Sequence, residues 1–403
     1  MVLGVAITPP GFKASGGVSA GLQLMKRVAD RTETQMLVMA EQDTTSSEDR
    51  LTVHRIRARN LLGAAPPRGL PRSLHTLMWR ADFGQWLDRL KPDLVHLHNP
   101  HPPGAFAQAA AEARRRGIPY VVSTHGYVEF EDYATAYGAP FWQRPLLHHL
   151  VRRPVAEVSR GAARIAMLSP EEKPILLRMG VPAERLEVVT NGVDPFFVDP
   201  FPEEDCKRLL SRFRLPSDRP LIFFVGNHTP NKGIDTLLAA SLRMRVPATV
   251  VVGGGIRSPA EHQAMLSEAG FEGSSGRVIF TDFLTRDELK ALYQRCDIFA
   301  FPSRADTLPL VILEAMVSRM AVVSTGVGGI PFQVSQDTGT LIPPGDAAAL
   351  AKALDALAAD PSRRRAMGEA GRRRALDLFN WDRSADEAVR IYRDILSRPP
   401  EER

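Results

Sequence analysis

The sequence predicts an α/β protein made of two Rossmann-like domains, each built around a parallel β-sheet. Three observations support this prediction. The chain has 403 residues, which is long for a single hydrophobic core. Short apolar runs alternate with helix-length segments along the chain. These runs are continuously apolar, as expected for strands whose two faces are both covered by helices.

Six apolar runs define the expected N-terminal domain, which we place at residues 1–197. Helix-length segments such as residues 17–29 and 104–116 connect these runs. Strand–helix–strand units with right-handed crossovers produce a doubly wound parallel sheet. The expected strands are residues 4–8, 35–40, 94–98, 120–124, 164–168 and 186–190.

Five further runs define the expected second domain, residues 198–380. We place the boundary in the stretch NGVDPFFVDPFPEED, because its prolines interrupt any regular pattern. A helical pattern beginning at Trp381 predicts a terminal helix, residues 381–403, that packs back on the first domain. The expected strands are residues 221–225, 249–252, 278–281, 298–302 and 321–324.

Composition and charge narrow the class of protein. No apolar run approaches the roughly 18 residues needed to span a bilayer, and the first residues resemble a buried strand rather than an export signal. The only two cysteines, Cys206 and Cys296, lie far apart in sequence and suggest neither a disulfide framework nor a metal site. We therefore expect a cytoplasmic protein, with the inner membrane face as an alternative location.

The net charge of +5 lies entirely in the first half of the chain. Residues 1–197 carry 24 Lys and Arg against 19 Asp and Glu, whereas residues 198–403 carry 27 of each. This asymmetry indicates either an anionic partner for the N-terminal half or an ordinary solvated basic face.

The stretch FFVGNHTPNKGIDTLLAA, residues 223–240, has the pattern of a phosphate-binding turn. A buried strand ends at Gly226, a polar loop carries Asn227 and Lys232, and Gly233 precedes a helical pattern. The first N–H groups of a helix point toward an anion at its N-terminus. The spacing does not match the P-loop motif, so another phosphate ligand is indicated.

The stretch FPSRADTLPLVILEAMV, residues 301–317, supplies two carboxylates near a second helix N-terminus. A strand ends at Pro302, a loop carries Asp306, and an apolar helix starting near Leu308 and Pro309 carries Glu314. At the carboxyl ends of parallel strands, both acids can face one crevice. Carboxylates suit sugar hydroxyls and a helix N-terminus suits phosphate. A nucleotide diphosphate sugar contains both groups.

Taken in order, the motifs resemble those of the retaining glycosyltransferase family 4, the glycosyl transferases of group 1. The resemblance covers nearly the whole chain and implies the GT-B architecture, in which two Rossmann-like domains face each other across a central crevice. The first domain would then take the acceptor and the second the nucleotide sugar. The matching segments are GGVSAGLQLMKRVA, PDLVHLHNP, VVSTHG, LEVVTNGVD, FVGNHTPNKGIDTLL, VVGGG, CDIFAFPSRADTLPLVILEAM, VVSTGVGGIP and GTLIPPGD.

The resemblance implies a role for each matched residue. Lys232 would hold the donor diphosphate, Glu314 the ribose hydroxyls and Asp306 the transferred sugar. His125 would lie near the sugar and the acceptor, so His125, Lys232 and Asp306 are the expected catalytic residues. Taken alone, these three would also suit a core histidine, a surface turn and a helix cap. The remaining donor contacts are expected from Gly16, Gly17, Asn227, Leu308, Pro309 and Leu310.

A lysine and a helix N-terminus can stabilise a departing diphosphate without a metal, and the chain contains no Asp-x-Asp motif. We therefore expect a retaining transferase that needs no metal or other cofactor. The expected donor is a UDP- or GDP-sugar. The expected acceptor is a hydroxyl group. An envelope glycolipid, a polysaccharide intermediate and a small molecule are the alternatives for the molecule that carries it, with an anionic or lipid-linked acceptor among them.

Four positions depart from the usual family pattern. Asn227 stands where an arginine normally assists Lys232, and Asp306 stands where a glutamate is commoner. Arg319 replaces a glycine after the helix, and Phe332 replaces a frequent acid. Asparagine lacks the charge and the fork of arginine, which puts the strength of donor binding in question. The candidate substitutes for the missing charge are His228, Arg257 and Arg304.

Residues 71–90 and 144–160 are rich in apolar and basic side chains. This composition predicts a helical surface for a membrane or a lipid-linked acceptor. An ordinary helix packed in the first domain, with arginines reaching solvent, is the alternative. The candidate contacts are Arg72, Trp79, Arg80, Arg152 and Arg153.

Two competing functions follow from the same residues. One is a weakly active or non-catalytic GT-B protein that binds a nucleotide sugar or a membrane. The other is a UDP-sugar 2-epimerase, a class that lacks the arrangement of Lys232-Gly233 with Asp306 and Glu314. We expect no nucleic-acid partner, because no recognised binding module accompanies the basic clusters.

Overall fold

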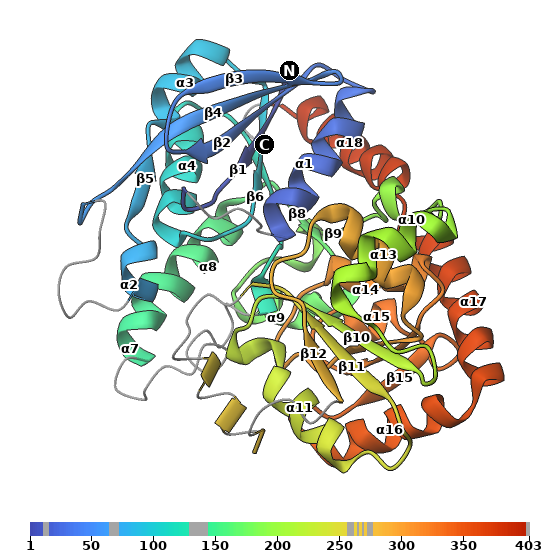
Figure 1. The fold of residues 1–403 in the computed structure, drawn as a ribbon. Coiled ribbons are helices and arrows are strands. Elements are labelled where there is room, and N and C mark those ends of the chain that lie inside the picture. Colours follow the sequence, from blue (N-terminus) through green and yellow to red (C-terminus); the bar gives the residue numbers. More distant parts are fainter. Residues whose placement is uncertain are drawn as a thin grey trace. The chain divides into compact units, whose positions relative to one another are not determined.

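The computed structural model describes residues 1–10, 16–63, 72–128, 144–255, 262–263, 266–267, 270–271 and 277–399, without the side chains of residues 72 and 73. These residues form two compact units. The first contains the described residues up to 191 together with 381–399, and the second contains those from 192 to 380. Each unit has a wholly or mostly parallel sheet covered by helices, which confirms the predicted fold class (Figure 1).

The first unit is built on a sheet with the strand order β3-β4-β2-β1-β6-β7-β8-β9, and β5 pairs with β4. β3 and β5 run antiparallel to β4, whereas the other neighbours are parallel. β3, β4 and β5 are absent from the predicted strands, because these segments mix polar and apolar residues. The bounds are β1 Val2–Ala6, β2 Thr34–Ala40, β3 Thr44–Glu48, β4 Leu51–Asn60, β5 Trp79–Ala81, β6 Leu94–His98, β7 Tyr120–Ser123, β8 Arg164–Met167 and β9 Leu186–Val188.

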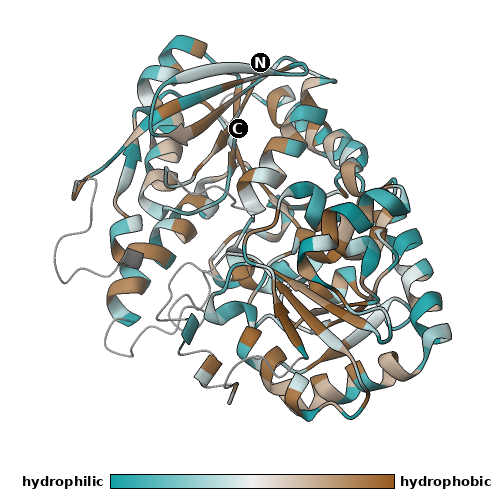
Figure 2. Cartoon of the chain, in the orientation of Figure 1, coloured by the Kyte–Doolittle hydropathy of each residue, from teal (hydrophilic) through white to brown (hydrophobic). Residues whose placement is uncertain are grey.

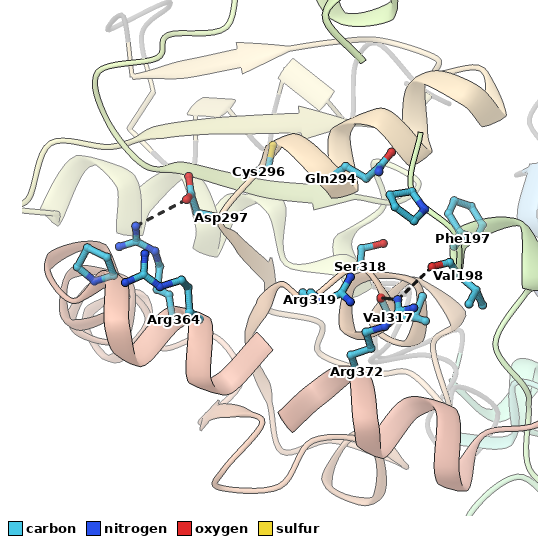
Figure 3. A pocket seen from close by; sticks show the side chains of 13 residues that line it. Phe197, Val198, Gln294, Cys296, Asp297, Val317, Ser318, Arg319, Arg364 and Arg372 are labelled. Carbon is cyan, nitrogen blue, oxygen red and sulfur yellow. Dashed lines mark hydrogen bonds and ion pairs between the residues drawn. The ribbon is translucent and has the colours of Figure 1, made fainter. Parts of the chain in front are cut away.

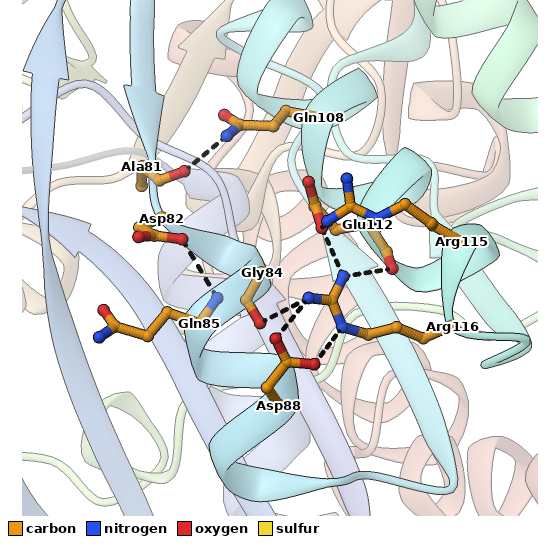
Figure 4. A network of polar contacts seen from close by, with 9 residues as sticks. All are labelled: Ala81, Asp82, Gly84, Gln85, Asp88, Gln108, Glu112, Arg115 and Arg116. Carbon is orange, nitrogen blue, oxygen red and sulfur yellow. Dashed lines mark hydrogen bonds and ion pairs between the residues drawn. The ribbon is translucent and has the colours of Figure 1, made fainter.

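The helix predicted for residues 71–90 is wrong. The segment forms α2 (Arg72–Thr76), strand β5 and α3 (Phe83–Leu90). β5 pairs with the end of β4, so its backbone groups are satisfied by the sheet. The Asp82 side chain then caps α3 by accepting the backbone N–H of Gln85 at 3.1 Å (Figure 4). Pairing at the sheet edge outweighs the helical spacing of the apolar residues.

Arg116 joins α3 to the neighbouring helix α4 (Pro103–Arg115). Its guanidinium donates to the Asp88 carboxylate on α3 at 2.6 and 2.7 Å and to the Gly84 carbonyl at 3.1 Å. It also contacts the Glu112 carboxylate of α4 (Figure 4). One arginine at the end of α4 thus holds α3 in place.

The C-terminal helix α18 (Trp381–Ser397) belongs to the first unit and packs against α1 (Gly16–Ala29). Arg31, just after α1, donates to Asp386 at 2.5 Å. Further along α18, the Tyr392 hydroxyl lies 2.6 Å from Nδ1 of the buried His96. The remaining helices of this unit are α7 Arg144–Leu147, η2 His148–Arg152, α8 Arg153–Gly161, η3 Pro170–Glu172, α9 Lys173–Arg178 and η4 Ala183–Arg185.

The second unit has an all-parallel sheet with the order β12-β11-β10-β13-β14-β15. Hydrophobic residues concentrate on its strands, as their continuously apolar sequences require (Figure 2). β15 alone is absent from the strands predicted for this unit. The bounds are β10 Leu221–Val225, β11 Thr249–Gly253, β12 Val278–Phe280, β13 Ile298–Phe301, β14 Ala321–Thr325 and β15 Gly339–Ile342.

Helices cover this sheet and connect its strands. Between α14 and β14 the backbone of Arg319 has φ 63°, so this position does adopt the left-handed conformation that glycine favours. The helices are η5 Pro195–Phe197, α10 Glu203–Leu210, η6 Ser211–Phe213, η7 Pro230–Lys232, α11 Ile234–Arg243, α13 Arg286–Arg295, α14 Leu310–Val317, α15 Ile330–Gln333, α16 Ala347–Ala359 and α17 Pro361–Leu378.

Candidate functional site

Each unit carries a group of candidate site residues, and the group in the second unit, which we call the donor site, begins at the turn between β10 and α11. Gly233 has φ 70°, and a Cβ atom at this position would lie 2.0 Å from the Pro302 carbonyl oxygen. Only glycine therefore allows the start of α11 to approach the loop that follows β13. This close approach places Lys232 beside that loop.

The structure brings Lys232 and Asp306 together. The Lys232 ammonium donates to the Asp306 carboxylate at 2.5 Å, and both side chains are mostly buried. Asp306 is not the cap of α14, because the N-cap residue is Pro309 and it forms no side-chain capping bond. The buried Gln333 side chain donates to the Pro309 carbonyl at 3.0 Å and fixes this turn. A cation, a carboxylate and a helix N-terminus are thus grouped at the carboxyl ends of β10 and β13.

Glu314 lies one turn into α14, with the Tyr293 hydroxyl of α13 donating to its Oε2 at 2.8 Å. Burial raises the pKa of the Glu314 carboxyl to about 7, although the Tyr293 hydrogen bond opposes the rise. Burial raises the pKa of the Tyr293 hydroxyl well above its usual value, and the neighbouring Glu314 raises it further. A carboxylate that is costly to ionise here suits a ligand that offers it hydroxyl groups. No motif marked Tyr293 in the sequence, since its spacing is that of an ordinary packed helix.

Of the three expected substitutes for the arginine missing at Asn227, the two that the structure describes are engaged or neutral. Arg304 donates to the carboxylate of Asp235 at 2.8 Å and to the Pro230 carbonyl at 2.7 Å. Burial, with a contribution from His262, lowers the pKa of His228 to about 4, so this imidazole is neutral near pH 7. Arg257 lies outside the described residues. In the described loop that follows β10, the charged side chain that contacts Asp306 is therefore that of Lys232.

The group of candidate residues in the first unit lies where α1 begins. A Cβ atom on Gly17 would lie 2.9 Å from Cβ of His125 and 3.4 Å from the side-chain Oδ1 of Asn99, so glycine allows close contact there. A Cβ atom on Gly16 would meet nothing within 4 Å. The structure therefore brings Gly17 and His125 together, and Gly16 continues the same turn.

His125 follows β7 and is buried, and burial lowers its pKa to about 4. Its neighbour His98 is also fully buried, with ring centroids 5.9 Å apart. Neither ring nitrogen of His98 has a hydrogen-bond partner in the described part of the chain. His96, by contrast, is held by Tyr392 and Ser123. The His125 side chain is thus a neutral imidazole in a poorly solvated setting.

The residues expected on the acceptor side lie on four different elements, namely α2, β5, η2 and α8. Arg80 donates to the carbonyls of Trp79 at 2.8 Å and Leu77 at 3.3 Å, and burial lowers its pKa. Arg153 is exposed and pairs with Glu157 at 2.8 Å. The side chain of Arg72 lies outside the described residues, and Arg152 ends helix η2.

No group of three or more His, Cys, Asp or Glu residues that could hold a metal ion is found among the described residues. Within the same residues, every helix is too short or too polar to cross a bilayer.

Two parallel α/β units, with a lysine turn and an acidic helix in the second, define a protein of the GT-B class. The model described as glycosyl transferases group 1 matches residues 205–374, and the model for glycosyltransferase family 4 matches residues 15–196. The chain belongs to this family of glycosyltransferases.

Two relatives and one solved structure illustrate the similarity. The D-inositol 3-phosphate glycosyltransferase of Frankia alni is 31% identical over 343 residues, which are 79% of this chain and 81% of that protein. The alpha-maltose-1-phosphate synthase of Mycolicibacterium smegmatis is 32% identical over 225 residues. That alignment covers 53% of this chain and 57% of the synthase. The structure of Anabaena HepE in complex with UDP and glucose has a TM-score of 0.73 at 19% identity and covers 98% of this chain and 100% of HepE.

Proposed function

We propose that the chain is a retaining, metal-independent glycosyltransferase that moves a sugar from a nucleotide diphosphate sugar to a hydroxyl acceptor. The observation that carries the proposal is the grouping of Lys232, Asp306 and the N-terminus of α14, with Glu314 one turn further along the same helix. Lys232 and the helix end suit a diphosphate, and Glu314 suits the hydroxyls of a ribose.

The proposed reaction needs no group beyond the donor and the acceptor. The bond from the anomeric carbon to the diphosphate oxygen breaks, and the acceptor oxygen bonds to the same face of that carbon. The acceptor proton passes to the departing diphosphate. Lys232 and the first N–H groups of α14 stabilise the negative charge that develops on this leaving group.

The carboxylate of Asp306 has a second role in this proposal. Because it holds the Lys232 ammonium at 2.5 Å, it fixes the position of the cation and offers a second oxygen to the hydroxyls of the transferred sugar. Asp306 positions Lys232, and the donor diphosphate then binds beside the ammonium.

UDP is the proposed nucleotide, because HepE, a structure of the same fold, was solved with UDP and glucose. The proposed acceptor carries a hydroxyl on an anionic or lipid-linked molecule. The excess of basic residues in the first half of the chain supports an anionic acceptor. The name of the Frankia alni relative, which is that of a transferase for an inositol phosphate, supports it as well.

The test is a transfer assay in EDTA with UDP-sugars and GDP-sugars and a panel of polyol phosphates and lipid-linked acceptors. We expect release of the nucleoside diphosphate together with a product whose anomeric configuration matches that of the donor, as judged by NMR. An inverted product, an isomerised sugar, or activity that requires added divalent metal would contradict the proposal.

A second candidate function is a nucleotide-sugar-binding protein with little or no turnover. The observation that favours it is the missing charge at Asn227, which neither Arg304, paired with Asp235, nor the neutral His228 replaces in the described part of the chain. This candidate predicts donor binding without product, and rapid turnover by the native chain excludes it.

A further inference from the structure

The second unit contains a pocket at the end of its sheet where β13 begins, opposite the donor site. The pocket has a volume of about 410 Å³, which is within the range of small-molecule sites. Asp297, which directly precedes β13, and Ser318, which directly follows α14, both line it. The donor site with Lys232 and Asp306 instead follows the carboxyl ends of β10 and β13, so the pocket and the donor site are distinct.

We propose that this pocket binds a small anion that carries a phosphate group. Four arginines line it, against a single acid, Asp297. Guanidinium groups match the geometry of phosphate oxygens and bind them with paired hydrogen bonds. This proposal goes beyond the transfer reaction and does not depend on it. The four are Arg319, Arg364, Arg365 and Arg372.

The carboxylate in the wall offsets only part of this charge. Arg364 lies 3.6 Å from the Asp297 carboxylate and donates to the Leu357 carbonyl at 2.7 Å. Arg372 contacts the carbonyl oxygens of Val198 and Val317 (Figure 3). Carbonyl groups accept hydrogen bonds but carry no net charge, so they leave the guanidinium charges in place. An anion in the pocket would supply the missing counter-charge.

Like charges are crowded in this wall. Burial lowers the pKa of the Arg372 guanidinium and the neighbouring Arg319 lowers it further, whereas Glu369 and Asp199 oppose the shift. Figure 3 shows Arg319 and Arg372 gathered on one side of the pocket and Arg364 with Asp297 on the other. A phosphate group placed between the two sides would relieve this repulsion.

Two of the arginines and the Ser318 hydroxyl have hydrogen-bonding groups that no contact among the described residues uses. Arg319 meets Glu369 through Nε at 2.8 Å, on a half-exposed side chain. Arg365 is exposed and makes no hydrogen bond or ion pair among the described residues. The Ser318 hydroxyl oxygen is buried in the same region without a partner. These groups can converge on a ligand without breaking a contact of the fold.

Arg319 also occupies a backbone position that favours glycine, because its φ is 63°. The resemblance to the family marks this arginine as a departure from the usual glycine, and the donor site does not use it. In this proposal the Arg319 side chain binds the anion in the pocket. The pocket also lies at the C-terminal end of α14, the helix that carries Glu314 of the donor site.

The test is calorimetric titration of the full chain with inorganic pyrophosphate in EDTA. The titration uses the Lys232→Ala variant, because pyrophosphate would also bind the donor site of the native chain. Into this variant we place Arg365→Gln or Arg319→Gly. The matched control is Arg363→Gln, which removes the same charge from the first turns of α17 at an exposed residue outside the pocket wall.

The Lys232→Ala chain is expected to retain one pyrophosphate site. Arg365→Gln and Arg319→Gly are each expected to weaken binding about tenfold or more, as the loss of a charged hydrogen bond does, while Arg363→Gln changes it less than twofold. Loss of all pyrophosphate binding in Lys232→Ala would overturn the proposal, since the native chain would then bind this anion only at the donor site. An equal effect of Arg363→Gln and Arg365→Gln would also overturn it, because net charge alone would explain the binding.

The two proposals fail in different ways. If the pocket proposal is wrong, UDP still binds the native chain and loses affinity in Lys232→Ala. If the proposed transferase function is wrong, pyrophosphate binding to the pocket and its loss in Arg365→Gln are unaffected.

Discussion

Replacing Glu314 by glutamine is expected to stabilise the protein at alkaline pH while weakening the donor site. Burial raises the pKa of this carboxyl from 4.5 to about 7. The difference of about 2.5 units corresponds to an upper limit of about 3.4 kcal/mol at about 1.36 kcal/mol per unit. Because the side chain is partly exposed, we expect about 1–2 kcal/mol.

The sign of the pH dependence follows from the protons bound. Between pH 4.5 and 7 the folded state holds more protons on Glu314 than the unfolded state, so the stability of the native chain falls as the pH rises through this window. Below pH 4.5 the carboxyl is protonated in both states and contributes nothing. The Glu314→Gln variant is neutral throughout, and its advantage should appear only as the pH rises above 4.5.

The assay is urea unfolding of both chains at pH 4.5, 6 and 8, followed by far-UV circular dichroism. Tryptophan fluorescence is unsuitable, because the four tryptophans, at positions 79, 86, 142 and 381, lie outside the 192–380 segment that carries Glu314. Glu204→Gln is the matched control, since the Glu204 side chain is 85% exposed.

The expected result is a difference in stability between Glu314→Gln and the native chain that grows from near zero at pH 4.5 to about 1–2 kcal/mol at pH 8. Glu204→Gln should show no such growth. UDP affinity of Glu314→Gln should fall at pH 8, because the glutamine amide replaces a charged acceptor. A difference that stays constant with pH would refute the argument that Glu314 is held in a poorly solvated site.

Three further substitutions test other parts of the account. Gly233→Ala should cost about 1–3 kcal/mol and abolish donor binding, because its Cβ would lie 2.0 Å from a backbone oxygen; Gly345→Ala, with φ 78° and open space around it, should cost only about 1 kcal/mol in thermal unfolding. Arg319→Gly should raise stability by about 0.5–1 kcal/mol in urea, since it relieves a left-handed arginine and loses only an exposed ion pair; a destabilised variant would contradict this reasoning. Asn227→Arg should tighten UDP binding about tenfold by calorimetry, and unchanged affinity would show that the lost charge is already replaced.

The sequence is informative wherever one local pattern determines one structural outcome. Continuous apolar runs predict the parallel strands of both sheets, because such strands are buried on both faces. The glycine before α11 predicts a turn, and the structure adds the reason in the close approach to Pro302. The motif order identifies the family without any knowledge of side-chain contacts.

Long-range pairing is where prediction from the sequence fails. β5 is short and is formed because β4 offers an unpaired edge, which no property of residues 79–81 reveals. The choice of partner by Arg304 depends on how α11 packs beside the loop after β13, and this packing directs the guanidinium to Asp235. The role of Tyr293 as the partner of Glu314 likewise depends on the packing of α13 beside α14.

The same limit applies to the arginine pocket. Its lining residues come from segments between positions 197 and 372, and each arginine alone resembles an ordinary helix-end or surface residue. Only the fold brings their charges together against a single acid.

The most direct test of the central claim is calorimetric titration of UDP in EDTA into the native chain and into Lys232→Ala. The account predicts that the native chain binds UDP without added metal. It also predicts that Lys232→Ala binds about 10- to 100-fold more weakly, because one charged contact to the diphosphate is lost. Equal affinity of the two chains, or binding that appears only after a divalent metal is added, would contradict it.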